Sequence, residues 1–141
     1  MILIKEKDIV MINHLDDKNR SSRHPFLVIE TTDKYFFALQ VTACKFDNQG
    51  NIVLSKFQKE YLSNNEQYFD VDINDGFKYV SWVLLNRIYK INFGENLFNI
   101  SVHGEMSNYI LFKKIRVNAK SINRLPISFN EILNNENFNI W

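Results

Sequence analysis

Short runs of apolar residues separated by polar turns fill the first two thirds of the chain. The first run, DIVMIN (8–13), is followed by the polar segment HLDDKNRSSRH (14–24). The runs PFLVIE (25–30) and YFFALQVT (35–42) then flank the turn TTDK. Apolar, β-branched and aromatic runs bounded by Pro, Asn, Asp and Ser are typical of strands. The pattern therefore predicts a strand at 8–13, a long loop at 14–24 and a hairpin over 25–42.

The middle of the chain continues in the same way. FDNQGNIVL predicts a second hairpin with its turn at 47–51, and a helical turn is compatible with 57–62. A strand is expected at 67–73, before the turn signal DG. YVSWVLLN (79–86) reads as a buried strand that contains Trp82 in the core, and RIYKINF alternates with the period of a half-buried strand.

The last third of the chain changes character. SVHGEMSNYILFKKIRV is compatible with a short helix. His103, which precedes a glycine near the start of this segment, is interpreted as a loop or cap residue. Ser128 followed by Glu131 forms a capping-box pattern that predicts a final short helix. Many short strands followed by late helices predict a mainly β fold of the α+β type, a small β-barrel with C-terminal helices.

Composition narrows the class of protein. The 141 residues suit one domain spanning 1–141, and 45% hydrophobic residues, with 12 phenylalanines, supply a sizeable core. The formal net charge of +1 gives no overall basic excess, so a nucleic-acid site would have to be a local patch. The single cysteine, Cys44, excludes an internal disulfide and is interpreted as a small buried residue. No signal peptide or run of about 20 apolar residues is seen, which predicts a cytoplasmic protein outside membranes.

Donor-rich side chains gather just ahead of the run PFLVIE. Long polar loops of this kind are more often functional than decorative. We expect this loop to hold a nucleic-acid backbone, because cations and hydroxyls bind phosphate oxygens. The residues expected to line it are Lys18, Arg20, Ser21 and Ser22, followed by Arg23 and His24.

The order of these motifs resembles that of the MazF/PemK (Kid-like) toxin family. The matching segments are KDIVMIN, a polar loop, RHPFLVIE, a turn, YFFALQVTA and, much later, VSWVLLNRIYKIN. They cover roughly 7–45 and 78–111, more than half of the chain. The resemblance implies an SH3-like, Kid-type barrel that forms a homodimer. It also implies metal-independent endoribonuclease cleavage of single-stranded RNA, and a cognate antitoxin as protein partner.

The resemblance places the site at Arg23 and Thr42, with two departures. The family arginine stands directly before the proline, whereas here His24 takes that place and Arg23 lies one residue earlier. A shift of one position in an extended segment turns a side chain to the opposite face. The glycine that opens the family's first strand is Lys7 in this chain.

The residue types fit RNA cleavage without a metal or cofactor. His24 titrates near neutral pH and can act as base or acid on the 2′-hydroxyl or the leaving oxygen. Arg23 offers a forked cation for the phosphorane-like transition state, and Thr42 can donate a hydrogen bond to a phosphate oxygen. The three histidines lack the spacing of a metal site.

Plainer interpretations of the same residues remain open. A histidine before a proline is commonly a turn residue, an arginine on a loop is commonly solvated, and Thr42 suits a strand end by propensity alone. The displaced arginine favours an alternative function, a catalytically silent SH3-like barrel that binds RNA or a protein. A third hypothesis, a structural protein of a phage or mobile element, rests only on small size and the incomplete motif.

Overall fold

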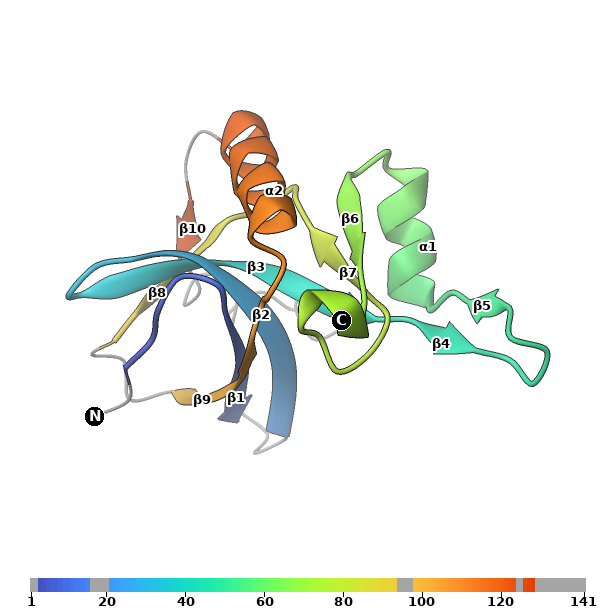
Figure 1. Ribbon diagram of the computed structural model, residues 1–141, viewed down its shortest axis with the longest axis horizontal. Coiled ribbons are helices and arrows are strands. Elements are labelled where there is room, and N and C mark those ends of the chain that lie inside the picture. The colour runs from blue at the N-terminus through green and yellow to red at the C-terminus, as the bar shows by residue number, and fades with distance from the viewer. Residues whose placement is uncertain (1–2, 16–20, 94–97, 124–125, 129–141) are drawn as a thin grey trace.

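The computed structural model describes residues 3–15, 21–93, 98–123 and 126–128, with the backbone alone at 13–15, 21–24, 98–99 and 127–128. Within these ranges the chain is mainly β with two α-helices (Figure 1). The elements are β1 (Asp8–Leu15), β2 (Ser21–Thr31), β3 (Tyr35–Ala43), β4 (Lys45–Phe46), β5 (Ile52–Val53), α1 (Lys56–Ser63), β6 (Tyr68–Val71), the 3-10 helix η1 (Ile73–Asp75), β7 (Ser81–Leu84), β8 (Tyr89–Asn92), β9 (Phe98–Glu105), α2 (Tyr109–Ile122) and β10 (Ile127–Ser128).

Eight strands form one sheet. Its main path runs β10-β8-β3-β2-β1-β9, and β7 pairs with β3 while carrying β6 on its other side. All of these pairs are antiparallel except β10–β8. The hairpin β4–β5 is a separate ribbon that projects from the body of the molecule (Figure 1). Within the described residues no pairing joins the two ends of the path, so the sheet stays open. The mainly β, α+β class is confirmed at this level.

The predicted hairpin over 25–42 and the hairpin turn at 47–51 are confirmed, but the loop predicted at 14–24 is largely wrong. β1 continues to Leu15 and β2 begins at Ser21, so that His14 pairs with Ser22 and Leu15 with Ser21. Backbone groups pair in a ladder whatever the side chains, so a polar sequence can extend a strand whose partner lies beside it. Residues 16–20 of the predicted loop lie outside the described residues.

The tail also differs from the sequence prediction. The segment 98–105, expected to lead into a helix, is the edge strand β9, which places His103 in a strand. The helix that follows, α2, is longer than expected and begins where the Asn108 side chain accepts a hydrogen bond from the Leu111 N–H. The last helix predicted from Ser128 lies outside the described residues, apart from Ser128 itself in β10. Neither α1 nor α2 has the length and apolar run that crossing a membrane requires.

Alternation along β3 divides the core into two sides. Odd-numbered residues of β3 pack towards α2, and even-numbered residues pack against β8 and the other side of β1 and β2. The first cluster includes Leu39, Val41, Phe112, Ile115 and Ala119, and the second includes Phe36, Ala38, Phe26, Ile12 and Tyr89. Phe37, with the Tyr35 ring packed against it, thus lies on the α2 side of β3, and Phe36 lies on the other side.

A third cluster lies under α1. Trp82, only 3% exposed, packs with Cys44, Tyr61 and Leu84. This confirms Trp82 as a core residue and Cys44 as a small buried one. Burial, reinforced by the nearby Asp70 carboxylate, raises the pKa of the Cys44 thiol. The thiol therefore stays protonated at neutral pH, which fits a packing role.

Candidate functional site

The strands β2 and β3 separate at the place where the sequence predicts a site. Their pairing runs from Thr31–Phe36 to Phe26–Gln40 and stops there. Beyond this last pair β2 stays with β1, whereas β3 pairs with β7. Figure 1 shows the two strands diverging towards different parts of the molecule. We call residues 21–25 of β2 and 41–43 of β3 the arms of the β2–β3 fork.

Two of the predicted catalytic positions lie on opposite arms of the fork. If the Phe26–Gln40 register is continued for two residues along both strands, it leads to His24 on one arm and Thr42 on the other. The two positions are not paired with each other: His24 pairs with Ile12 of β1, and Thr42 pairs with Trp82 of β7. Arg23 pairs with Asn13.

The remaining predicted residues lie along the same arm or outside the structure. Ser21 and Ser22 begin β2 and pair with Leu15 and His14 of β1. Lys18 and Arg20, expected to hold the RNA backbone, lie outside the described residues. The structure thus places Ser21, Ser22, Arg23 and His24 on one strand, where the sequence predicted a loop.

The Thr42 hydroxyl is tied to the start of α1. The side-chain amide of Gln58 donates to Thr42 Oγ1 at 3.5 Å and to the Ala43 carbonyl at 3.3 Å. Gln58 is only 2% exposed and is fixed by a capping box, in which the Ser55 N–H donates to Gln58 Oε1 and the Gln58 N–H donates to Ser55 Oγ. Sequence analysis missed Gln58, although Ser55 followed by Gln58 is itself a capping-box signal.

A second polar residue sits at the base of the fork. Gln40, in the last β2–β3 pair, is 3% exposed, and its Oε1 has no hydrogen-bond partner among the described residues. Gln40 and Thr42 point to the same side of β3, because they are two residues apart in a strand. A buried acceptor without a donor costs about 1–3 kcal/mol. Gln40, Thr42 and Gln58 therefore form a largely buried polar strip beside the apolar core.

Aromatic rings continue this strip. Thr42 pairs with Trp82 and Trp82 with Asp70 across β3, β7 and β6. The Trp82 ring stacks on the half-buried Tyr68 ring, with centroids 4.1 Å apart and planes 19° from parallel. Burial raises the pKa of Tyr68, with a further contribution from Asp70. Tyr68 therefore stays neutral across the physiological pH range and contributes a flat apolar surface.

Several basic residues of the second half of the chain lie on α2. Those of α2 belong to the helix that covers the odd-numbered face of β3, whereas the Gln40–Thr42 strip faces the even-numbered side. Arg116 pairs with Glu6 and Lys120 with Glu30, each at 3.2 Å. Lys113 lies over the Tyr109 ring, 4.6 Å from its centroid. These α2 cations are thus partly paired, and they do not line the described part of the fork.

Two features were missed by sequence reasoning. Ser101 and His103, exposed on β9, are hydrogen-bonded at 2.8 Å between Ser101 Oγ and His103 Nε2. The alternation of Ile100 and Val102 between polar residues was the signal for this strand. Lys7 has a φ of 73°, in the left-handed region that favours glycine.

No group of three His, Cys, Asp or Glu side chains is placed to hold a metal ion in the part of the chain that the structure describes. No family model matches the chain, and neither curated proteins nor solved structures give a match. Similarity to known proteins therefore rests on the sequence motifs described above.

Proposed function

We propose that this chain is a MazF/PemK-like toxin, an endoribonuclease that cleaves single-stranded RNA at the β2–β3 fork without a metal ion. The observation that carries the proposal is the fork itself. The positions that the resemblance selects belong to its two arms, Arg23 and His24 to the β2 arm and Thr42 to the β3 arm. The unpaired Gln40 Oε1 at its base supports a polar ligand there, because RNA offers hydroxyl and amine donors.

The backbone at Lys7 also supports the proposal. The family has a glycine at this position, and here a lysine adopts the φ of 73° that glycine adopts without cost. A local backbone requirement is therefore retained although the residue has changed. The Lys7 N–H donates to the Val28 carbonyl at 2.9 Å and the Met106 N–H to the Lys7 carbonyl at 2.8 Å, which joins the start of β1 to β2 and β9.

The proposed reaction uses the 2′-hydroxyl of the RNA as nucleophile. His24 takes the 2′-hydroxyl proton and the 2′-oxygen forms a bond to phosphorus. The bond to the 5′-oxygen breaks as that oxygen receives a proton from water. Arg23 and the Thr42 hydroxyl stabilise the charge on the phosphoryl oxygens during this exchange. The products are a 2′,3′-cyclic phosphate and a 5′-hydroxyl end. The proposal includes an SH3-like barrel, a homodimer, a cognate antitoxin and a cytoplasmic location.

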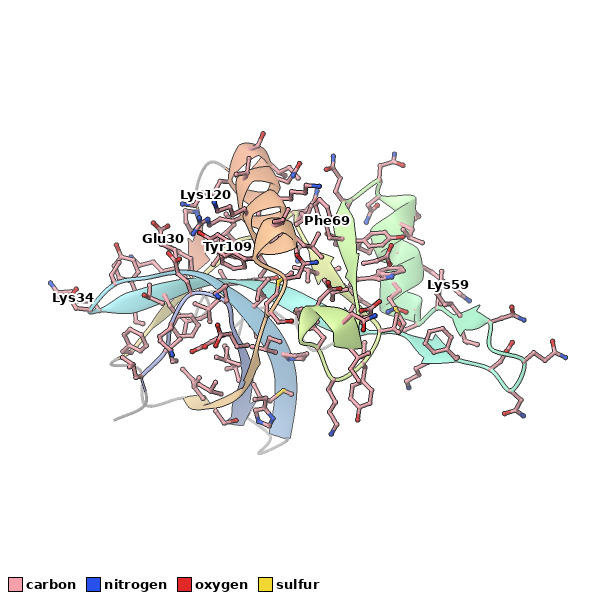
Figure 2. All side chains as sticks on the ribbon, viewed as in Figure 1. Glu30, Lys34, Lys59, Phe69, Tyr109 and Lys120 are labelled. Carbon is pink, nitrogen blue, oxygen red and sulfur yellow. The ribbon has the colours of Figure 1, made fainter. Side chains whose placement is uncertain are left out.

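Thr42 gives a matched test of this reaction. Purified protein is incubated with mixed single-stranded RNA in EDTA, and new 5′-hydroxyl ends are mapped. Thr42→Val removes the hydroxyl at nearly constant volume and is expected to reduce cleavage about 10- to 100-fold, whereas Thr42→Ser should retain most of it. Lys34→Ala is the control, because Lys34 lies at the other end of β3 (Figure 2). Absence of cleavage by the wild-type protein would contradict the proposal.

Growth provides a second test. Expression of the wild-type protein is expected to arrest bacterial growth, and Arg23→Ala is expected to relieve the arrest. For His24, cleavage should vary with pH near neutrality and should be lost in His24→Ala while the unfolding curve is unchanged. If His24→Ala cleaves at the wild-type rate, His24 has no part in the reaction.

The bond from Gln58 to Thr42 favours a second candidate function, a catalytically silent module that binds RNA or a protein. A hydroxyl that already receives a hydrogen bond from a buried side chain has a structural use. In that case Thr42→Val would lower the free energy of unfolding, and the wild-type protein would retain labelled RNA or a protein partner without producing 5′-hydroxyl ends.

A further inference from the structure

A cleft of about 370 Å³ lies between β2, β3 and the C-terminal end of α2, on the side of the sheet opposite to the Gln40–Thr42 strip. Its size is within the range of small-molecule sites. Most of its surface is apolar. The lining residues are Ile29, Glu30, Phe37, Ile88, Lys120, Asn123 and Pro126.

A β-bulge brings the Glu30 carboxylate to this cleft. The β2–β3 register shifts between Val28 and Glu30, so that Val28 pairs with Ala38 but Glu30 pairs with Phe37. Without the shift, Glu30 would follow the alternation of β2 to the buried face that holds Val28. Because of the bulge, Ile29 and Glu30 both line the cleft beside Phe37. Bulges of this kind re-aim side chains and are frequent beside functional sites.

A lysine ammonium lies beside the Glu30 carboxylate. The Lys120 ammonium of α2 lies 3.2 Å from Glu30 Oε2, and both side chains remain nearly half exposed. Figure 2 shows the two residues next to each other beside α2. A pair exposed to this degree contributes little to stability, so its atoms are available to a ligand at little cost. Together the pair offers two carboxylate acceptors beside an ammonium donor, with no net charge.

Asn123 adds an acceptor, and Phe37 adds a flat surface. Both hydrogens of the Asn123 side-chain amide are used, in bonds to the Leu85 carbonyl at 2.6 Å and the Ala119 carbonyl at 2.8 Å. Its polar contribution to the cleft is therefore the carbonyl oxygen. Phe37 is half-buried and has the Tyr35 ring packed against it edge-on at 5.2 Å. A planar ring can stack on such a surface.

We propose that this cleft binds a guanine base. The Watson–Crick edge of guanine carries two adjacent N–H donors, which match the two oxygens of Glu30, and a carbonyl acceptor, which matches the Lys120 ammonium. Adenine, cytosine and uracil each offer this carboxylate a single donor group, so they leave one of its oxygens unmatched. A neutral base also suits a neutral ion pair better than a phosphate does. The base belongs either to a free nucleotide or to an RNA strand, and the proposal does not depend on RNA cleavage.

Binding of nucleoside monophosphates to the full chain tests the proposal. By calorimetry or by chemical-shift titration, GMP is expected to bind at least tenfold more tightly than AMP, CMP or UMP. IMP, which lacks the 2-amino group, should bind about tenfold more weakly than GMP, since a hydrogen bond to a carboxylate is worth about that factor. Equal affinity for the four common nucleotides, or no saturable binding up to millimolar GMP, would overturn the proposal.

Variants of the ion pair locate the site. Glu30→Gln and Lys120→Met should each weaken GMP binding about tenfold. Asp33→Asn and Lys34→Met, the matched changes at the exposed β2–β3 turn, should leave it unchanged. Unchanged binding in Glu30→Gln would show that GMP does not use this cleft.

Competition separates the two sources of the base. A single-stranded oligouridine with one central guanosine displaces GMP if the ligand is part of RNA, and fails to displace it if only free nucleotides enter. Displacement should be lost when the guanosine is replaced by uridine. Displacement by the all-uridine strand at equal concentration would contradict recognition of guanine.

Discussion

Gly76 fixes the junction between η1, β9 and α2, and its replacement by alanine tests how closely these elements meet. Gly76 ends η1 with a φ of 101°, where residues with a Cβ are strained. A Cβ built at this position would lie 2.3 Å from the Glu105 carbonyl oxygen and 2.9 Å from the Ser107 nitrogen. Both contacts are backbone atoms, held in place because the Ser107 N–H donates to the Asp75 carbonyl at 2.8 Å. The clash therefore cannot be relieved by a side-chain rotation.

The expected loss has two parts. The left-handed backbone costs a residue with a Cβ about 1–2 kcal/mol. Forcing the backbone apart to admit a methyl group adds about 1–3 kcal/mol, the usual cost of overpacking. We therefore expect Gly76→Ala to lower the free energy of unfolding by about 2–5 kcal/mol.

Gly50 supplies the matched control. It sits at the turn between β4 and β5 with a φ of 82°, and nothing lies within 4 Å of an added Cβ. Gly50→Ala should therefore show the backbone cost alone, about 1–2 kcal/mol. Urea denaturation of the wild type and both variants, with equal m-values, gives the comparison. Equal losses in the two variants would refute the close approach of Gly76 to the β9–α2 junction.

Four further predictions concern α1 and its surroundings. Tyr61→Phe should cost about 1–3 kcal/mol, because the Tyr61 hydroxyl donates to the Gln67 carbonyl and accepts from the Leu85 N–H; a change below 0.5 kcal/mol in urea would count against it. Burial raises the pKa of Tyr61 to about 12, so its contribution to the free energy of unfolding is full below about pH 10 and is lost as the pH rises towards 12. The stability of Tyr61→Phe should therefore fall less than that of the wild type between pH 10 and 12, measured by urea unfolding at each pH. The raised pKa of Cys44 predicts that a thiol reagent at pH 7 modifies the folded protein far more slowly than the urea-unfolded chain, and equal rates would contradict its burial. Ser55→Ala should cost about 1 kcal/mol by removing the cap of α1, with unchanged denaturation as the contrary result.

Local pattern was sufficient for much of the fold. The hairpin over 25–42, the turn at 47–51 and the buried Trp82 follow from periodicity, turn residues and apolar content, which act over a few neighbouring residues. His103 was misplaced because its strand, β9, exists by pairing with β1 across the sheet, and a distant partner leaves only a weak trace in the local sequence. The same reason explains the extension of β1 and β2 into the polar segment.

For the candidate site too, the sequence indicated some residues and only the structure showed the others. The sequence indicated Arg23, His24 and Thr42 as chemically suitable, from residue type and order alone. It gave no sign of Gln40 as a buried acceptor or of Gln58 as the partner of Thr42, because both roles depend on where α1 and the diverging strands lie. The guanine cleft likewise depends on the bulge at Glu30 and on the distance to Lys120 of α2.

By itself, the sequence determined the strand-rich class, the main hairpins and the kinds of side chain present in the segment NRSSRHP, since these depend on composition and short-range pattern. Only the tertiary structure decided that β2 and β3 separate after the Phe26–Gln40 pair and that Glu30 and Lys120 meet. Both outcomes depend on contacts with elements farther along the chain: β3 pairs with β7, and Glu30 meets Lys120 of α2. They are set by which surfaces pack together, and a pattern read residue by residue carries no distance between such surfaces.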